Sequence, residues 1–151
     1  MGDIFRIAIC DDEEIYGEQC SNLCRDFFYT KKRQISVRQY HSALALMQDN
    51  IKHELIFLDI EMPEMTGIEA KNKLAEIQPQ AIIIFMTRHK EYMREAFGKN
   101  VYYFLDKPLD KSQFDQALQG VYRECFEVQQ IEIDEKHIVL IKQSICYDSN
   151  S

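Results

Sequence analysis

Short apolar runs alternate along this chain with segments that have helical periodicity. The runs cover residues 4–10, 35–40, 55–59, 81–86 and 101–105. In the third and fourth, which read LIFLDI and AIIIFM, apolar residues occupy successive positions rather than alternate ones. Such continuous runs are typical of strands that are buried on both faces, as in a parallel sheet that helices cover on each side.

The intervening segments are predicted to be helices. The expected helices cover residues 16–27, 42–50, 66–78, 91–97 and 110–128. Thr66, followed by Glu69 three residues later, indicates a capping box at the start of the third helix, and Gly98 is expected to end the fourth. Five strands that alternate with five helices predict a doubly wound α/β domain with a five-stranded parallel sheet over residues 3–129.

The composition excludes several classes of protein. The 151-residue chain has 18 Lys and Arg residues against 25 Asp and Glu residues, so its formal net charge is -7, which argues against this chain alone binding nucleic acid. The longest uninterrupted apolar run, residues 81–86, is far shorter than the roughly 20 residues that span a bilayer. The N-terminus lacks the basic stretch followed by an apolar one that marks a secretory signal. We therefore expect a cytoplasmic protein with no membrane partner.

Polar side chains stand where four of the predicted strands end. Asp11 and Asp12 follow the first strand, Asp59 ends the third, Thr87 follows the fourth and Lys107 follows the fifth. Taken singly, each has an ordinary structural explanation, such as an acidic residue at a helix N-terminus or a surface charge. In a doubly wound sheet, however, the carboxyl ends of the strands meet near the topological switch point, where ligands bind. The order of these residues therefore predicts a single site.

The residue types at these strand ends complement one another chemically. Three ionised carboxylates at one edge repel unless a cation lies among them, and oxygen ligands favour a hard ion such as Mg²⁺. A lysine and a hydroxyl group at the same edge are suited to bind an anion, so the whole set predicts a phosphoryl-binding site. Asp59 is the candidate nucleophile, which would become an aspartyl phosphate.

Four stretches give the chain a resemblance to a known family. IAICDDE, LIFLDIEMPEMTGIE, IIIFMT and YYFLDKPL resemble parts of the receiver domain of bacterial two-component response regulators. The D-x-x-M-P-x-M-x-G string that begins at Asp59 is a specific motif, and the Thr and Lys-Pro at suitable distances downstream add to its specificity. The resemblance covers roughly residues 3–129 and implies the flavodoxin-like (βα)5 receiver fold.

The resemblance also assigns a phosphoacceptor and a metal site. It implies that a sensor histidine kinase phosphorylates Asp59 in a Mg²⁺-dependent reaction. Asp12 and Asp59 would ligate the Mg²⁺ ion, Asp11 would act through a water molecule, and Glu61 would offer its backbone carbonyl.

A switch is the next implication of the resemblance. Thr87 and Lys107 would hold the phosphoryl oxygens, and Thr87 would move inward so that Phe104 turns into the space it leaves. This movement would change the face formed by the fourth helix, the fifth strand and the fifth helix, and we expect that face to form a homodimer on phosphorylation. The chain is then a phosphoacceptor regulatory domain that assists its own phosphorylation and dephosphorylation, and is not an enzyme.

Three residues are expected to tune the reaction rates. Glu61 and His89 lie where receivers tune the hydrolysis of the acyl phosphate. The residue after the threonine is usually small in receivers, whereas this chain has Arg88. The bulk and charge of Arg88 are expected either to screen the phosphoryl group or to contact it.

The C-terminal residues 130–151 have the pattern of a short β tail. The sequence HIVLIKQSICYDSNS is similar to the first strands of a LytTR-type DNA-binding domain, with Ile145, Tyr147 and Ser149 as the matching residues. This similarity implies a transcription regulator that contacts DNA only through a C-terminal domain absent from this chain. The alternative is a β tail that packs on the main domain.

Two other functions compete with this interpretation. A stand-alone receiver would act through protein contacts alone. A Mg²⁺-dependent phosphohydrolase of the haloacid dehalogenase type also phosphorylates an aspartate, but it places the nucleophile on the first strand, whereas here an acidic pair precedes Asp59. Turnover of p-nitrophenyl phosphate that is abolished by Asp59→Ala would favour the hydrolase.

Overall fold

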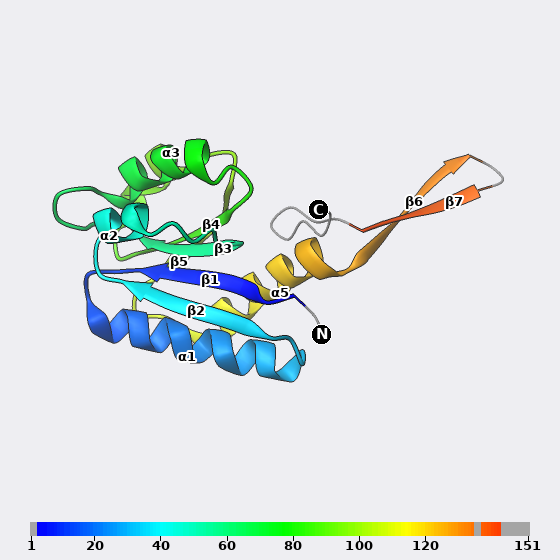
Figure 1. Cartoon of the computed structure of the whole chain (residues 1–151), viewed down its shortest axis with the longest axis horizontal. Helices are drawn as coiled ribbons and strands as arrows, with labels where there is room; N and C mark the ends of the chain where they lie inside the picture. Colours follow the sequence, from blue (N-terminus) through cyan, green and yellow to red (C-terminus); the bar gives the residue numbers. More distant parts are fainter. Residues whose placement is uncertain (1–2, 135–136, 143–151) are drawn as a thin grey trace.

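A single sheet of five parallel strands lies at the centre of the fold (Figure 1). The computed structural model describes residues 3–134 and 137–142. The strands are β1 (Phe5–Cys10), β2 (Ile35–Tyr40), β3 (Leu55–Asp59), β4 (Ile82–Thr87) and β5 (Val101–Asp106). They lie in the order β2-β1-β3-β4-β5, and every neighbouring pair is parallel. The doubly wound sheet that the sequence predicts is therefore confirmed.

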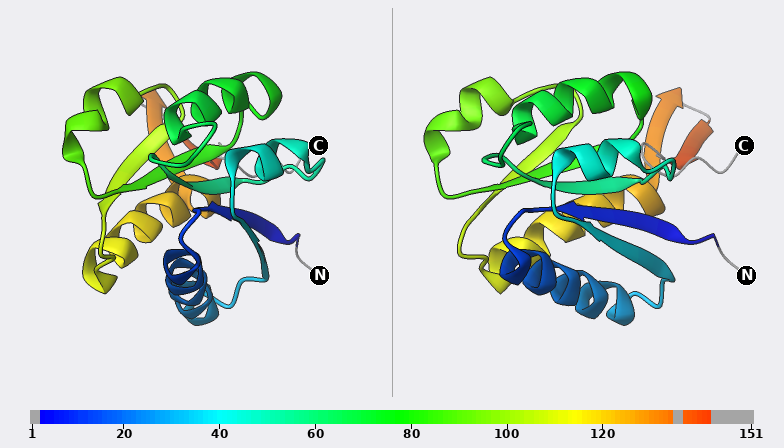
Figure 2. Two further views of the ribbon diagram at one scale, coloured as in Figure 1. Left: turned by 90° about the vertical axis from the view of Figure 1, so that its left-hand side faces the viewer. Right: turned by 60° about the vertical axis from the view of Figure 1, so that its left-hand side comes forward.

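Helices cover both faces of the sheet. They are α1 (Glu14–Thr30), α2 (Ala43–Gln48), α3 (Gly67–Ile77), α4 (Met93–Ala96), which follows the 3₁₀ turn η1 (Lys90–Tyr92), and α5 (Lys111–Phe126). Helices α1 and α5 pack together on one face, and α2, α3 and α4 lie on the other (Figures 1 and 2). Within the part of the chain that the structure describes, no helix is long and apolar enough to cross a membrane.

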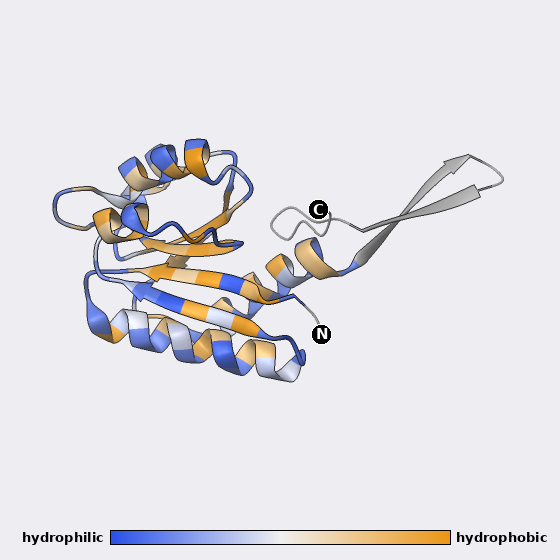
Figure 3. Cartoon of the chain, viewed as in Figure 1, coloured by the Kyte–Doolittle hydropathy of each residue, from blue (hydrophilic) through white to orange (hydrophobic). Residues whose placement is uncertain are grey.

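The two-sided burial of the sheet accounts for the continuous apolar runs. In β1, Ile7 and Ile9 join the apolar cluster beneath α1 and α5, whereas Ala8 and Cys10 join the cluster beneath α2, α3 and α4. Residues 55–58 of β3 alternate in the same way and are fully buried. The edge strand β2 mixes polar and apolar residues instead (Figure 3).

The fourth helix is shorter than the sequence predicts. A helix over residues 91–97 is expected to end at Gly98, but η1 passes into α4, which ends at Ala96. Phe97 already has extended backbone angles, with φ −63° and ψ 143°. Gly98 has no positive φ. The helix therefore ends because Phe97 leaves the helical conformation, and not through a left-handed glycine.

A two-stranded hairpin follows α5. The strands β6 (Val128–Asp134) and β7 (His137–Lys142) are antiparallel, and Figure 1 shows them leading away from the end of α5. This agrees with the expected β tail, although α5 ends at Phe126, two residues earlier than predicted, because Glu127 has an extended conformation. The residues that carry the LytTR resemblance, Ile145, Tyr147 and Ser149, lie outside the described residues.

Helix α3 begins with the predicted capping box. The backbone N–H of Glu69 donates to Thr66 Oγ1 at 3.1 Å, and the backbone N–H of Thr66 donates to Glu69 Oε1 at 2.9 Å. One residue into the helix, the N–H of Gly67 donates to the carbonyl oxygen of Ile60 at 2.8 Å. The last of these bonds fixes the first residue of α3 to Ile60, the residue that follows Asp59.

Gly67→Ala is expected to destabilise this junction. A Cβ atom at position 67 would overlap the carbonyl oxygen of Asp59 and lie 2.9 Å from Cα of Ile60, and neither backbone atom can move aside freely. We expect the free energy of unfolding, measured by urea denaturation, to fall by roughly 1–3 kcal/mol. Gly98→Ala is the matched control, since its added Cβ meets only the flexible end of Lys71 at 3.0 Å. Equal losses in the two variants would contradict this account.

Candidate functional site

The strand order brings the predicted site residues to one edge of the sheet. Asp11 directly follows β1, and Asp59 ends the adjacent strand β3. Thr87 ends β4, on the other side of β3, and Lys107 directly follows β5. Because these neighbouring strands are parallel, their carboxyl ends place the four side chains next to one another. Together with Asp12, these residues are called the acidic site below.

Lys107 lies at the centre of the acidic site. Its side chain is 1% exposed, and its Nζ lies 2.8 Å from Asp11 Oδ2 and 3.4 Å from Asp59 Oδ1. Glu13 Oε2 lies 3.7 Å from the same nitrogen. An ammonium group placed between buried carboxylates offsets part of their repulsion.

The carboxylates of the acidic site are suited to hold a divalent cation. One oxygen atom from each of Asp11, Asp12, Glu13 and Asp59 lies within 4.8 Å of the others. Asp11 and Asp59 are buried, whereas Asp12 is exposed, so the site opens to solvent at Asp12. Buried Asp11 Oδ2 makes no hydrogen bond with the described residues, although Lys107 is close to it. This oxygen is available to a cation or its bound water, and the all-oxygen set fits Mg²⁺.

The electrostatics of the acidic site also favour an added cation. Burial raises the pKa of Asp59 from 3.8 to about 8, and the negative charge of Asp11 acts in the same direction, while Lys107 opposes both. Burial lowers the pKa of Lys107, but its close contact with Asp11 and the neighbouring carboxylate charges outweigh this and leave the pKa raised. Lys107 is therefore cationic at neutral pH, yet its single charge does not relieve the repulsion around Asp59.

Thr87 and Phe104, the predicted switch residues, border the same hollow. The buried hydroxyl of Thr87 accepts a hydrogen bond from the backbone N–H of His89 at 2.9 Å. Phe104 is half-buried and stacks on Phe85 with 5.6 Å between the ring centroids. Both line a hollow of about 410 Å³ whose walls come from η1, α4, β5 and α5. A movement of either side chain would therefore change the shape of this hollow between α4, β5 and α5.

The sequence as a whole matches one known family. A profile of the response regulator receiver domain matches residues 7–119, which is most of the chain and includes the whole acidic site. This chain belongs to the response regulator receiver family.

Curated relatives of this receiver are named as regulatory proteins. The transcriptional regulatory protein HptR of Staphylococcus aureus is 29% identical over 126 residues, which cover 83% of this chain and 50% of HptR. The positive alginate biosynthesis regulatory protein of Pseudomonas aeruginosa is 29% identical over 117 residues, which cover 78% of this chain and 47% of that protein. The receiver thus spans about half the length of the curated relatives it matches.

Solved structures confirm the fold. The response regulatory domain of MrkE from Klebsiella pneumoniae has a TM-score of 0.68 and 24% sequence identity with this chain, and the match covers 77% of this chain and 93% of that domain. The flavodoxin-like receiver fold that the sequence predicts is therefore confirmed.

Two of the predicted rate-tuning residues meet at the rim of the receiver's acidic site. His89 Nε2 lies 3.3 Å from Glu61 Oε1, and His89 Nδ1 lies 3.3 Å from Glu91 Oε2. The side chains of Glu61 and His89 are about half exposed, at 52% and 43%. Both side chains are therefore in contact with solvent.

The third residue predicted to tune the rates, Arg88, has a partner that the sequence did not indicate. Arg88 Nη1 donates to Glu13 Oε2 at 2.9 Å, and Nη2 donates to Glu13 Oε1 at 3.1 Å. This contact lowers the pKa of Glu13 below its usual value. The only available signal for Glu13 was its place in the acidic run that follows β1.

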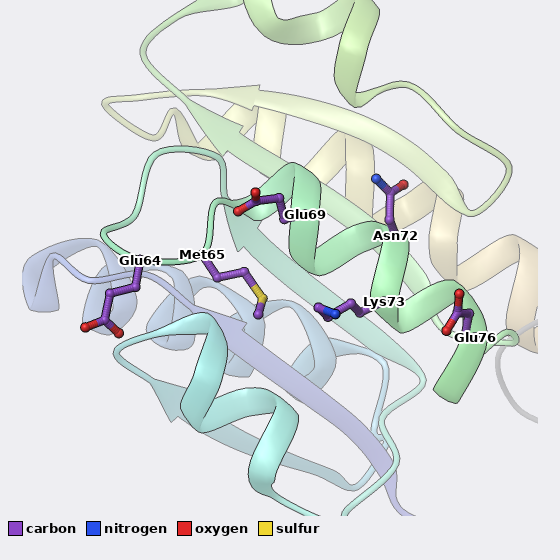
Figure 4. A pocket seen from close by; sticks show the side chains of 6 residues that line it. All are labelled: Glu64, Met65, Glu69, Asn72, Lys73 and Glu76. Atoms are coloured by element: carbon purple, nitrogen blue, oxygen red, sulfur yellow. The ribbon is translucent and has the colours of Figure 1, made fainter.

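A second hollow lies along α3, apart from the acidic site (Figure 4). It is lined by Glu64, Met65, Glu69, Asn72, Lys73 and Glu76. All of these side chains except Met65 are exposed. None of the predicted site residues lines it.

Proposed function

We propose that this receiver accepts a phosphoryl group on Asp59 from a sensor histidine kinase in a Mg²⁺-dependent reaction. The observation that carries the proposal is buried Lys107, which lies within 3.4 Å of a carboxylate oxygen on both Asp11 and Asp59. Exposed Asp12 leaves the acidic site open to solvent on one side. Phosphoryl transfer to a carboxylate uses a fixed cation beside that carboxylate and further oxygen ligands for a metal ion, and this site has both.

The transfer would be a displacement at phosphorus. An oxygen of the Asp59 carboxylate attacks the phosphorus atom of a phosphohistidine, and the P–O bond forms as the P–N bond breaks. The electron pair of that bond goes to the imidazole nitrogen, which takes up a proton from water. Lys107 binds a phosphoryl oxygen and Thr87 donates its hydroxyl hydrogen to another.

Mg²⁺, when bound, supplies the positive charge that offsets the carboxylates and the phosphoryl oxygens. Asp12 and Asp59 would hold it directly, Asp11 would hold it through water, and Glu61 would contribute its backbone carbonyl. Buried Asp11 Oδ2, which has an ion-pair partner in Lys107 but no hydrogen-bond donor among the described residues, supports this assignment.

Phosphorylation would then switch the face formed by α4, β5 and α5. Movement of Thr87 toward the phosphoryl group breaks its contact with His89 and opens space toward which Phe104 can turn. Exposed apolar side chains on this face, Met93, Phe97 and Tyr102, suit it to form a homodimer. Light scattering at high micromolar concentration should show a dimer after phosphorylation, and a receiver that stays monomeric would contradict the dimer.

Acetyl phosphate tests the phosphoacceptor directly. With Mg²⁺, we expect the intact mass of the wild type to increase by one phosphoryl group, and we expect no increase for Asp59→Asn or for the wild type in EDTA. Equal labelling of wild type and Asp59→Asn would mean that Asp59 is not the nucleophile. The same preparations should not turn over p-nitrophenyl phosphate, since we propose a regulatory domain and not an enzyme.

The downstream output is proposed to be transcription. The matched relatives are named as regulatory proteins, HptR as a transcriptional one, and they are about twice as long as the matched region. This supports a cytoplasmic regulator whose receiver (residues 3–129) leads through the tail (residues 130–151) into a LytTR-type DNA-binding domain. The mass of the native polypeptide in its cell tests this. A product about a hundred residues longer would support it, and a product that ends at Ser151 would leave a stand-alone receiver.

A further inference from the structure

A bidentate ion pair joins two loops at the mouth of the acidic site. Arg88 directly follows β4, and Glu13 follows Asp12 in the loop after β1. The two hydrogen bonds from the Arg88 guanidinium to the Glu13 carboxylate measure 2.9 and 3.1 Å. The same guanidinium lies over the ring of Tyr16, 5.2 Å from its centroid. Two parallel charge-assisted bonds make this the strongest geometry for such a pair.

Glu13 is shared between two cations. Its Oε2 accepts the hydrogen bond from Arg88 and also lies 3.7 Å from Lys107 Nζ. The Lys107 ammonium faces the same Tyr16 ring, at 4.4 Å from the centroid. The Glu13 carboxylate therefore lies between the Lys107 ammonium and the Arg88 guanidinium, beside Asp59. A phosphoryl group on Asp59 is also an anion, and these two cations could bind it instead of Glu13.

We propose that Glu13 competes with the phosphoryl group for these cations, and that Arg88 becomes a phosphoryl-binding residue once Glu13 releases it. This inference rests on the proposed phosphorylation of Asp59. Phosphorylation adds negative charge beside Glu13, whose carboxylate oxygen lies within 4.8 Å of an Asp59 oxygen. Like charges at this distance repel, and the phosphoryl oxygens offer Lys107 and Arg88 a more highly charged partner.

The exposure of the two side chains allows this exchange. Glu13 is 39% exposed and Arg88 is 48% exposed, so Glu13 can turn toward water without leaving a buried charge behind. Lys107, by contrast, is held by Asp11 and cannot leave. The exchange therefore moves two rim side chains while the centre of the acidic site stays in place.

Binding of beryllofluoride, a non-covalent phosphoryl analogue, tests the exchange in the full chain with Mg²⁺. Titration calorimetry should show that Arg88→Ala weakens binding by about threefold to tenfold, the range for a partly exposed charge-assisted contact. Glu13→Gln should tighten binding by a similar factor. The gain should shrink in the double variant, which has no guanidinium to release. Arg88→Lys, which keeps the charge without the planar fork, should fall between the wild type and Arg88→Ala.

Arg25→Ala is the matched control, because Arg25 is an exposed arginine on α1, outside the face formed by α4, β5 and α5. An Arg88→Ala variant that binds beryllofluoride as tightly as Arg25→Ala would overturn the inference. An undiminished gain from Glu13→Gln in the double variant would also overturn it, because Glu13 would then act independently of Arg88. If the wild type binds no beryllofluoride and takes no phosphoryl group from acetyl phosphate, the result contradicts the proposed phosphorylation of Asp59 itself and not only the role of Arg88.

Discussion

Lys107→Ala is expected to lower the free energy of unfolding of the metal-free receiver by about 3 kcal/mol, since removing one partner of a buried ion pair leaves its partners uncompensated. In the wild type, Lys107 Nζ lies 2.8 Å from Asp11 Oδ2 and 3.4 Å from Asp59 Oδ1, and the lysine side chain is 1% exposed. Without it, the buried Asp11 carboxylate has no fixed cation beside it. Urea denaturation in EDTA at pH 7 measures the loss.

Lys111→Ala is the control for this experiment. Lys111 also makes a close ion pair, 2.6 Å from Asp115, but its side chain is 68% exposed, so solvent replaces the lost contact and little change is expected. Mg²⁺ should restore part of the stability of Lys107→Ala, because the ion supplies positive charge to the same carboxylates. Equal stability of the two variants in EDTA would contradict the central place given to Lys107.

Asp59→Asn is expected to make the metal-free receiver more stable, and increasingly so as the pH rises. Burial raises the pKa of Asp59 from 3.8 to about 8, so between these values the folded chain holds a proton that the unfolded chain has released. The stability of the wild type therefore falls as the pH rises through this window. Asparagine carries no such proton. The variant should match the wild type near pH 4 and exceed it at pH 8 by at least about 1 kcal/mol, since a tenfold change in proton affinity is worth roughly 1.4 kcal/mol.

In excess Mg²⁺, the wild type should instead be more stable than Asp59→Asn. A ligand that binds only the folded state stabilises it by mass action, and Asp59→Asn removes one of the proposed carboxylate ligands. Urea denaturation at pH 5 and pH 8, in EDTA and in excess Mg²⁺, measures both effects. Parallel pH profiles for the wild type and Asp59→Asn in EDTA would show that Asp59 has an ordinary pKa.

Much of the fold could be predicted from local patterns of apolar and capping residues in the sequence. Continuous apolar runs such as residues 55–58 predict a doubly covered sheet because both faces of each strand must be buried. Thr66 and Glu69 predict the start of α3 because a capping box is a local interaction over three residues. The gathering of Asp59, Thr87 and Lys107 at one edge follows from parallel strand ends, although the sequence does not establish their roles.

Contacts between distant loops were not predictable in this way. Arg88 and Glu13 are 75 positions apart, and their pairing depends on the path of two loops that no periodicity describes. His53 is a similar case. Nothing in the sequence indicates a partner for this histidine, but the structure buries it beside the ring of Tyr40, and the side chain of Gln78 accepts a hydrogen bond from its backbone N–H.

The most direct test of the account is to locate the phosphoryl group on the chain. Acetyl phosphate and Mg²⁺ label the receiver, borohydride then reduces the acyl phosphate of an aspartate to homoserine, and peptide mass spectrometry identifies the converted position. We expect homoserine at position 59 and nowhere else. Homoserine at position 11 or 12, or a phosphoryl group that resists borohydride, would contradict the claim that Asp59 is the phosphoacceptor.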